Sequence, residues 1–152
     1  GYAQAAVVRG YVYLLGGYSS SSANSTVYYA KLEPDCSIDS WSTTTSLPSA
    51  RYSHAVTVAG DHIYVVGGRS SYSASTRVYM ATPGTDGTIG SWSSESSMPD
   101  ALTTLGAVAT NGYIIVGGGY DGSNTQDTTY YGVIDDDGSI SGWGTGTAAL
   151  SG

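Results

Sequence analysis

The chain has 152 residues, enough for one ordinary domain or a short array of repeats. Its formal net charge is −7, which argues against binding to nucleic acid or anionic lipid, because both depend on Lys and Arg. A single cysteine excludes an internal disulfide and a thiolate-rich metal cluster. No run approaches the roughly 20 apolar residues that span a bilayer, so no membrane partner is expected.

The composition favours strands over helices. The chain contains 22 Gly, 14 Tyr and no Phe, and much of the remainder is Ser, Thr and Val. β-branched and aromatic side chains suit a pleated surface, and no window carries a long apolar stripe with a period of 3.6 residues. The sequence therefore predicts an all-β protein.

Three apolar runs, taken in chain order, each end at a pair of glycines. They are VYLLGG (12–17), IYVVGG (63–68) and IIVGGG (114–119), and each opens into a polar loop. A spacing of 51 residues relates the members of four sets, which are Gly16-Gly17, Gly67-Gly68 and Gly118-Gly119; Trp41, Trp92 and Trp143; Tyr28, Tyr79 and Tyr130; and Asp35, Asp86 and Asp137. Three units, 1–51, 52–102 and 103–152, therefore account for one array with no second domain.

Four strand-like segments follow one another within the middle unit. They cover residues 53–60, 62–68, 76–82 and 89–94, and short turns or loops separate them. The second segment is almost continuously apolar and is expected to be buried on both faces. A four-stranded antiparallel meander of this size cannot bury its own faces, so each unit must stack on its neighbours.

This pattern resembles the kelch repeat, in which an aliphatic strand ends at Gly-Gly and is followed by a Tyr and then a Trp. The middle unit matches at Gly67-Gly68, Tyr79 and Trp92, and the segment PSARYSHAV (48–56) is similar to the inter-blade segment of that family. The repeat length agrees with the kelch period of about 50 residues. The resemblance covers the whole chain and implies a β-propeller, with each unit forming one blade. A mild departure is Leu102, which stands at the position of Arg51.

The repeated residues have expected structural roles. The glycines should let the second strand leave the sheet sharply and let blades approach closely, because Gly tolerates positive φ and lacks a Cβ. The three Tyr and three Trp of the repeat should fill the space between blades, with Trp92 well buried.

Three blades do not close a propeller, since closed rings typically have about 4–8 blades. Blades 1 and 3 would each expose an apolar flank, which marks an interface. The chain spans three repeats less one residue, so two copies could follow one another almost in phase. The sequence predicts a homodimer that forms a six-bladed ring with twofold symmetry, and the alternative is a fragment of a longer chain, natural or engineered.

The resemblance to kelch adaptor domains also implies a ligand face. In that family it carries the loops between second and third strands and the loops between blades, which here contain Tyr18, Arg51, Tyr52, Arg69, Tyr72, Tyr120 and Asn124. Tyr, Ser and Asn combine rigid contact area with adaptable hydrogen bonds, although Ser-rich loops are also typical of solvated turns. We therefore expect a non-catalytic scaffold that assembles with itself and binds a protein or carbohydrate ligand, or an assembly module with no ligand.

A galactose-oxidase-like copper enzyme, or another carbohydrate-active kelch enzyme, is the competing class. That copper site needs two His, two Tyr and a thioether-forming Cys, whereas His54 and His62 begin the two strands of one hairpin and should lie near opposite ends of the blade. The run 135–138 (DDDG) lacks the spacing of a calcium loop and is expected to be a hairpin turn. No catalytic residue, cofactor or metal site is therefore predicted, and the sequence indicates no cellular compartment.

Cys36 occupies the turn position that is Gly87 and Gly138 in the other units. A Cβ where φ should be positive costs about 1 kcal/mol. An exposed thiol is expected there, either as an incidental substitution or as a cross-linking site.

Overall fold

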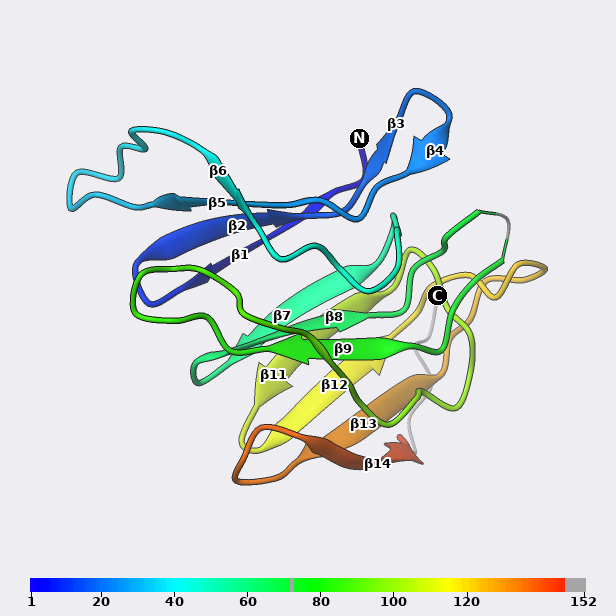
Figure 1. The fold of residues 1–152 in the computed structure, drawn as a ribbon. Helices are drawn as coiled ribbons and strands as arrows, with labels where there is room; N and C mark the ends of the chain where they lie inside the picture. The colour runs from blue at the N-terminus through cyan, green and yellow to red at the C-terminus, as the bar shows by residue number, and fades with distance from the viewer. Residues whose placement is uncertain (72, 147–152) are drawn as a thin grey trace.

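The computed structural model describes residues 1–71 and 73–146. Three four-stranded antiparallel sheets lie one above the other, and we call them blades 1, 2 and 3 in chain order (Figure 1). The expected all-β architecture with kelch-like blades is confirmed. In the described part of the chain, no helix has the length and apolar character needed to cross a bilayer.

Each blade is a meander in which strands pair in sequence order. Blade 1 consists of β1 (Gln4–Val8), β2 (Tyr11–Leu15), β5 (Val27–Lys31) and β6 (Ser42–Thr44), with a small hairpin of β3 (Tyr18–Ser19) and β4 (Ser22–Ala23) between β2 and β5. Blade 2 consists of β7 (Ala55–Ala59), β8 (His62–Val66), β9 (Val78–Ala81) and β10 (Ser93–Ser94). Blade 3 consists of β11 (Gly106–Thr110), β12 (Tyr113–Gly117), β13 (Thr129–Ile134) and β14 (Ile140–Thr145).

The fourth strand of blade 2 is shorter than the sequence predicts. Only Ser93 and Ser94 pair with β9, and Ile89 lies outside the strand. The backbone N–H of Ile89 instead donates to Thr44 Oγ1 in blade 1 at 2.7 Å, and its carbonyl accepts from the hydroxyl of Thr45. The residues before the short strand therefore join blade 2 to blade 1 rather than extend the sheet.

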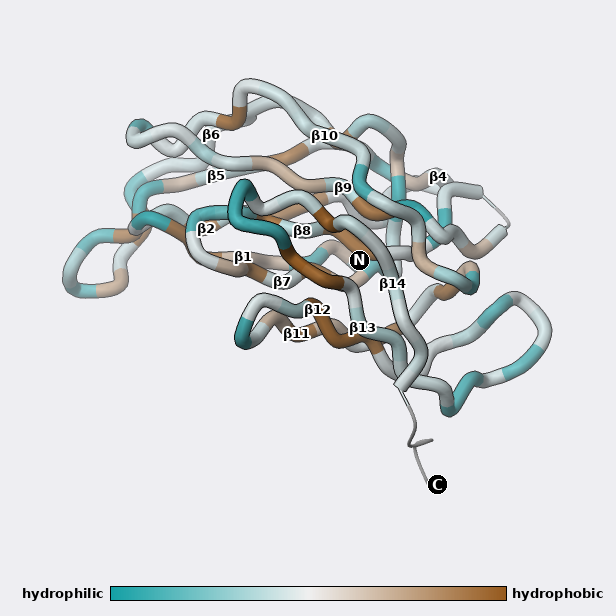
Figure 2. Tube along the Cα trace, turned by 90° about the horizontal axis from the view of Figure 1, so that it is seen from below, coloured by the Kyte–Doolittle hydropathy of each residue, from teal (hydrophilic) through white to brown (hydrophobic). Residues whose placement is uncertain are grey.

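Two apolar cores fill the two junctions between blades. The junction of blades 1 and 2 buries residues such as Tyr13, Leu15, Ile63, Val65 and Tyr79, and the junction of blades 2 and 3 buries Tyr64, Val66, Ile114, Val116 and Tyr130. Strand β8 supplies both cores from its two faces, so the expected burial on both faces holds for the middle blade. Figure 2 shows the hydrophobic positions along the strands and hydrophilic positions at many turns and loops.

Among the described residues, one face of blade 1 and one face of blade 3 have no neighbouring sheet. The blade 1 outer face exposes Val7, Leu14, Tyr28, Ile38 and Trp41. The blade 3 outer face exposes Val108, Tyr113, Ile115, Tyr131 and Val133. In blade 2 the residues 51 positions further on, such as Val65 and Tyr79, are buried against blade 1. The outer faces therefore expose apolar side chains at repeat positions that are buried at the junctions within the chain.

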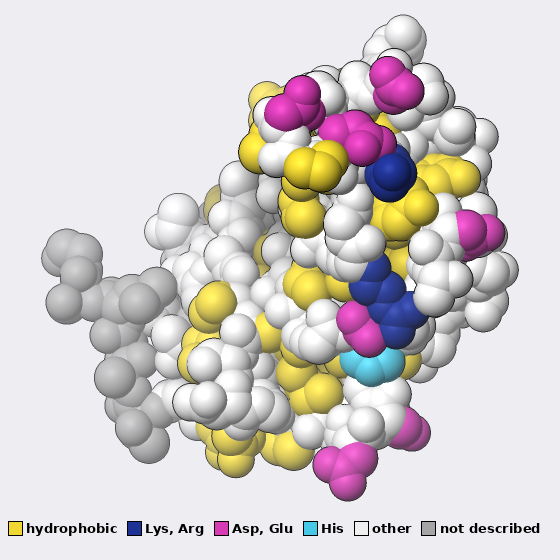
Figure 3. Space-filling view, turned by 90° about the vertical axis from the view of Figure 1, so that its left-hand side faces the viewer, with side chains coloured by type: hydrophobic (Ala, Val, Ile, Leu, Met, Phe, Trp, Pro, Cys, Tyr) yellow, Lys and Arg dark blue, Asp and Glu magenta, His cyan; other side chains and the backbone are white. Residues whose placement is uncertain are grey.

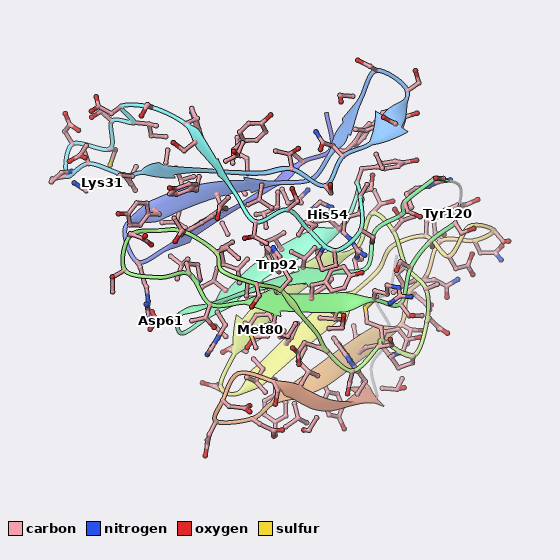
Figure 4. All side chains as sticks on the ribbon, viewed as in Figure 1. Lys31, His54, Asp61, Met80, Trp92 and Tyr120 are labelled. Atoms are coloured by element: carbon pink, nitrogen blue, oxygen red, sulfur yellow. The ribbon has the colours of Figure 1, made fainter. Side chains whose placement is uncertain are left out.

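The repeated aromatic residues are buried only where a blade lies against them. Tyr79 and Tyr130 are almost fully buried, whereas Tyr28 on the blade 1 outer face is 42% exposed. Trp92 is half-buried rather than well buried, because its indole N–H reaches the junction edge and donates to the carbonyl of Thr45 at 3.0 Å. Trp143 has the same arrangement, since its indole N–H donates to the carbonyl of Ser96 at 2.8 Å. Trp41, in the first blade, is exposed. In Figure 4, Trp92 lies on the blade 1 side of blade 2 and Met80 on the opposite side.

The glycine pairs join each blade to the next. Gly67 and Gly68 have φ values of 62° and 83°, and a Cβ on Gly67 would lie 2.7 Å from the carbonyl oxygen of Leu102. The N–H of Gly68 donates to that carbonyl at 2.8 Å. The same backbone clamp recurs one repeat earlier, where the N–H of Gly17 donates at 2.8 Å to the carbonyl of Arg51. Both expected uses of the glycines, the sharp exit and the close approach, are confirmed.

Candidate ligand-binding loop face

The loops that follow the second strands gather at one end of the blades. Figure 4 shows Tyr120 at this end, which we call the loop face, and Lys31 and Asp61 at the opposite end, which we call the turn face. Tyr52 and Arg69 exchange backbone hydrogen bonds of 3.0 Å in both directions, and Thr103 and Tyr120 do the same at 3.0 and 2.8 Å. The residue after each glycine pair is thereby fixed beside the inter-blade segment.

Three tyrosine rings cluster on the loop face between blades 1 and 2. The ring centroids of Tyr18 and Tyr52 are 4.7 Å apart, and those of Tyr2 and Tyr52 are 6.1 Å apart. The guanidinium carbon of Arg69 lies 5.7 Å from the centroid of the Tyr52 ring. This tyrosine cluster (Tyr2, Tyr18 and Tyr52) with Arg69 offers aromatic area, hydroxyl groups and one positive charge at a single place.

A shallow hollow of about 260 Å³ lies beside the tyrosine cluster. It is lined by one aromatic residue and by small residues, which are Tyr18, Ser21, Ser22, Ala23, Ser49, Ala50, Ser70 and Ser71. Hydroxyl groups at this density can donate to and accept from a polar chain that passes over them. The hollow is small for an enclosed ligand, which favours a bound segment over a buried small molecule.

Arg51 does not face a ligand as the resemblance implies. Its side chain is 2% exposed, and its Nη1 donates to the carbonyl of Gly67 at 2.7 Å while its Nη2 donates to Ser49 Oγ at 2.9 Å. The guanidinium carbon also lies 4.4 Å from the centroid of the Tyr79 ring. Burial lowers the pKa of Arg51, and Tyr79 opposes that change. Arg51 holds the junction of blades 1 and 2, because its long side chain finds acceptors inside that junction.

The predicted residues of blade 3 lie apart from the tyrosine cluster. Tyr120 is half-buried and makes no ring contact with the cluster among the described residues. Asn124 belongs to a compact turn, in which Asp121 Oδ1 accepts from the N–H of Asn124 at 2.7 Å and of Ser123 at 2.6 Å. These hydrogen bonds lower the pKa of Asp121. Tyr72, the remaining predicted residue, lies outside the described residues.

The two histidines lie at opposite ends of blade 2, as the hairpin geometry predicts. His54 is 2% exposed, and its ring lies 3.1 Å from the position of a Cβ on Gly16 at the loop-face end. His62 is at the turn face, where its Nδ1 is 2.7 Å from Thr82 Oγ1. Among the described residues, no group of three or more His, Cys, Asp or Glu side chains could hold a metal ion.

The acidic run at 135–138 forms the expected hairpin turn. Asp137 Oδ1 accepts hydrogen bonds from the N–H and the hydroxyl of Ser139 at 2.9 and 2.6 Å, and Gly138 has a φ of 86°. These contacts lower the pKa of Asp137, and Asp86 makes the same contacts with Thr88. The carboxylates are used within their own turns.

The turn face has a different chemistry from the loop face. Figure 3 looks at this end and shows basic side chains in a row, with acidic side chains around them. Arg9 Nη2 in blade 1 pairs with Asp61 Oδ2 in blade 2 at 2.6 Å, and Lys31 pairs with Glu33 at 3.1 Å. Exposed ion pairs of this kind contribute little stability, and we interpret the turn face as a solvated surface.

Comparisons with known proteins agree with this architecture. The family model described as the KLHDC2/KLHL20/DRC7 Kelch-repeats domain matches residues 2–137. The chain belongs to the kelch-repeat family. Among curated kelch relatives, beta-scruin of Limulus polyphemus is 34% identical over 128 residues, which cover 78% of this chain and 13% of that protein. Alpha-scruin of the same organism is 28% identical over 142 residues, which cover 89% of this chain and 14% of that protein. The chain thus spans about one-seventh of the length of these two relatives.

Tyr2 is the residue of the kelch loop face that the sequence analysis missed. It precedes the first strand at the position of Ser53 and Thr104, and all three residues have positive φ, at 61°, 51° and 57°. The N–H of Ser53 donates to the carbonyl of Tyr2 at 3.3 Å, and the N–H of Thr104 donates to that of Ser53 at 2.7 Å. The register of 51 residues was the available signal, since Tyr2 takes the place of Ser53, where the first expected strand of the middle unit begins.

Proposed function

We propose that this chain is a non-catalytic kelch scaffold that binds a protein partner through its loop face and closes into a six-bladed ring with a second copy. The tyrosine cluster beside Arg69 carries the first part of the proposal. The exposed outer faces of blades 1 and 3 carry the second part.

The chemistry of the loop face favours an extended peptide segment as the ligand. Tyr and Arg are the residue types that most often dominate binding energy at protein interfaces, and here they lie next to a hollow lined by serines. Arg69 supplies a positive charge on a chain whose net charge is −7, which favours a segment with at least one carboxylate. Aromatic rings can also stack on sugars, so a carbohydrate ligand is the alternative outcome of a binding test.

A parallel screen on a phage-displayed peptide library and a glycan array tests the binding role. We expect enrichment of peptides with an acidic residue, and at least a tenfold loss of affinity in Tyr52→Ala, because alanine removes the centre of the cluster. Asp136→Asn, an exposed change on the turn face, is the matched control and should bind as the wild type does. Glycan binding without peptide binding would replace the protein partner, and equal binding by Tyr52→Ala would contradict the site.

The ring follows from the cost of exposed apolar surface. The outer faces carry Trp, Tyr, Leu, Ile and Val side chains at positions that are junction surfaces elsewhere in the chain. A second copy can cover both faces at once, and the second contact then forms within an existing complex at low entropic cost. Light scattering at micromolar concentration should give about twice the chain mass of 15.6 kDa. A folded monomer at that concentration would rule the ring out.

A further inference from the structure

In blades 2 and 3, a tight turn packs under an aromatic ring of the preceding blade. A Cβ on Gly87 would lie 2.5 Å from Cδ1 of Tyr11, and a Cβ on Gly138 would lie 2.6 Å from Nε2 of His62. Contacts this close leave no space for a side chain at either turn. Both junctions within the chain therefore need glycine here, for steric reasons as well as for the positive φ.

A buried tyrosine hydroxyl completes the same contact. Tyr13 Oη donates to the carbonyl of Gly87 at 2.8 Å, and Tyr64 Oη donates to the carbonyl of Gly138 at 2.6 Å. Both tyrosines are fully buried, and burial raises the pKa of each to about 12, so the hydroxyls remain donors. The set consists of a ring, a hydroxyl and a turn glycine, and it repeats in register at both junctions.

The two outer faces carry this set in altered form. On blade 3 the ring position is Tyr113, but the hydroxyl position is Ile115, and both side chains are exposed. On blade 1 the turn position is Cys36, which is exposed and keeps the left-handed backbone with a φ of 65°. The turn of blade 1 therefore has Cys36 where the turns at the internal junctions have glycine. On blade 3, Ile115 stands where the internal junctions have a tyrosine. Both changes fall at positions that meet only if blade 3 packs on blade 1.

We infer that the blade 3 outer face of one copy packs head-to-tail on the blade 1 outer face of a second copy, with the Cys36 side chain seated beside Tyr113 and Ile115. Ile115 is smaller than the tyrosine found at this position in the internal junctions. The space that it leaves can accept the Cys36 thiol and the Tyr113 ring, which the thiol would push aside. The inference rests on the proposed ring and adds which faces meet and which residues are matched at the seam. Each ring then has two identical seams, with one Cys36 in each.

An engineered disulfide tests the pairing of the faces. Cγ of Tyr11 lies 2.7 Å from the position of a Cβ on Gly87, so Cβ atoms at these two positions lie no more than about 4 Å apart, within the range of a disulfide. After mild oxidation, Tyr113→Cys should run as a covalent dimer on a non-reducing denaturing gel. The double variant Tyr113→Cys with Cys36→Ser should not. Asp136→Cys, with the same number of thiols but away from the seam, should stay monomeric on that gel.

The alternatives give different results. A wild-type dimer linked through two Cys36 residues would show that like faces meet, which contradicts the head-to-tail seam. A native mass of two chains without a covalent product from Tyr113→Cys would overturn the pairing and leave the ring intact. A monomeric wild type without any covalent product from Tyr113→Cys would overturn both.

A size-swap cycle tests whether Ile115 and Cys36 are matched. Ile115→Tyr should weaken dimerisation at least about tenfold in sedimentation equilibrium, because the larger ring meets the Cys36 side chain. Adding Cys36→Gly to that variant should recover most of the loss, since it recreates the set found at the internal junctions. Additive effects of the two changes would show that these residues do not touch and would overturn the matched pair.

Discussion

The two junctions within the chain share a backbone and differ in their side chains. At both, the second glycine of a pair donates at 2.8 Å to a carbonyl of the next inter-blade segment, that of Arg51 in the first junction and of Leu102 in the second. The first junction buries the charged and titratable side chains of Arg51 and His54, whereas the second buries Leu102 and Leu105 at the same positions. Backbone geometry therefore defines how these blades join. The side chains buried at the junction can change from polar to apolar without altering that geometry.

The buried imidazole of His54 is expected to make the stability of the first junction depend on pH. Burial, with a smaller contribution from the charge of Arg51, lowers the pKa of His54 from 6.5 to about 4. The folded state therefore holds this imidazole neutral over a pH range in which the unfolded chain protonates it. The second junction has Leu105 at this position, whose side chain does not titrate.

The largest effect is expected where both junctions depend on the same glycine geometry. Gly67→Ala should destabilise the fold by about 3 kcal/mol or more in chemical unfolding, because the new Cβ would lie 2.7 Å from the carbonyl oxygen of Leu102 at a φ of 62°. Gly16→Ala should cost a similar amount. Gly60→Ala has positive φ but open space, so it should cost only about 1 kcal/mol. Tolerance at Gly16 but not at Gly67 would show that the clamps are not equivalent.

The second effect is the loss of stability in acid that is expected from His54, which only the first junction contains. Since the folded pKa of His54 lies below the unfolded value, its contribution to stability is present above about pH 6.5 and is lost as the pH falls towards 4. The difference amounts to about 3 kcal/mol. Urea midpoints measured from pH 4 to 7.5 should fall more steeply for the wild type than for His54→Leu, which imitates the second junction. Identical slopes would mean that His54 titrates normally.

The tryptophans should then distinguish internal junctions from outer faces. Trp92→Ala and Trp143→Ala should each cost about 2 kcal/mol, below the usual range for a core tryptophan because both are half-buried. These losses should not depend on protein concentration. The cost of Trp41→Ala should rise with concentration, because the proposed ring would place a blade of the second copy against this exposed side chain. A concentration-independent loss at Trp41 would place its partner within the same chain.

The smallest effect is expected when the first junction is given the residue of the second. Arg51→Leu should change the unfolding free energy by no more than about 1 kcal/mol, since a well-packed apolar side chain often replaces a buried charge without loss. Arg51→Ala should cost about 2–3 kcal/mol, because it opens a cavity beside Tyr79 in addition to removing the donor to the Gly67 carbonyl, a loss that Arg51→Leu shares. Equal losses in both variants would show that the guanidinium itself is required.

The repeat register predicts most of the fold and less of the site. Glycine pairs and apolar strands recur with fixed spacing, and their roles depend on backbone geometry that a sequence pattern records directly. The burial of Arg51 could not be predicted in this way, because it depends on acceptors that only the folded junction brings together. The exposure of Trp41 and Tyr28 depends in turn on whether a neighbouring blade is present, which a repeat pattern does not contain.

The backbone clamp also has a consequence for the order of folding. Each blade pairs its strands in sequence order, so the strands of one blade can begin to pair before the next blade has been made. The N–H of Gly17 acquires its acceptor only when the segment containing Arg51 has followed, and the N–H of Gly68 waits likewise for Leu102. During synthesis, the blade made last therefore exposes an apolar face. The next blade covers that face when it packs on it.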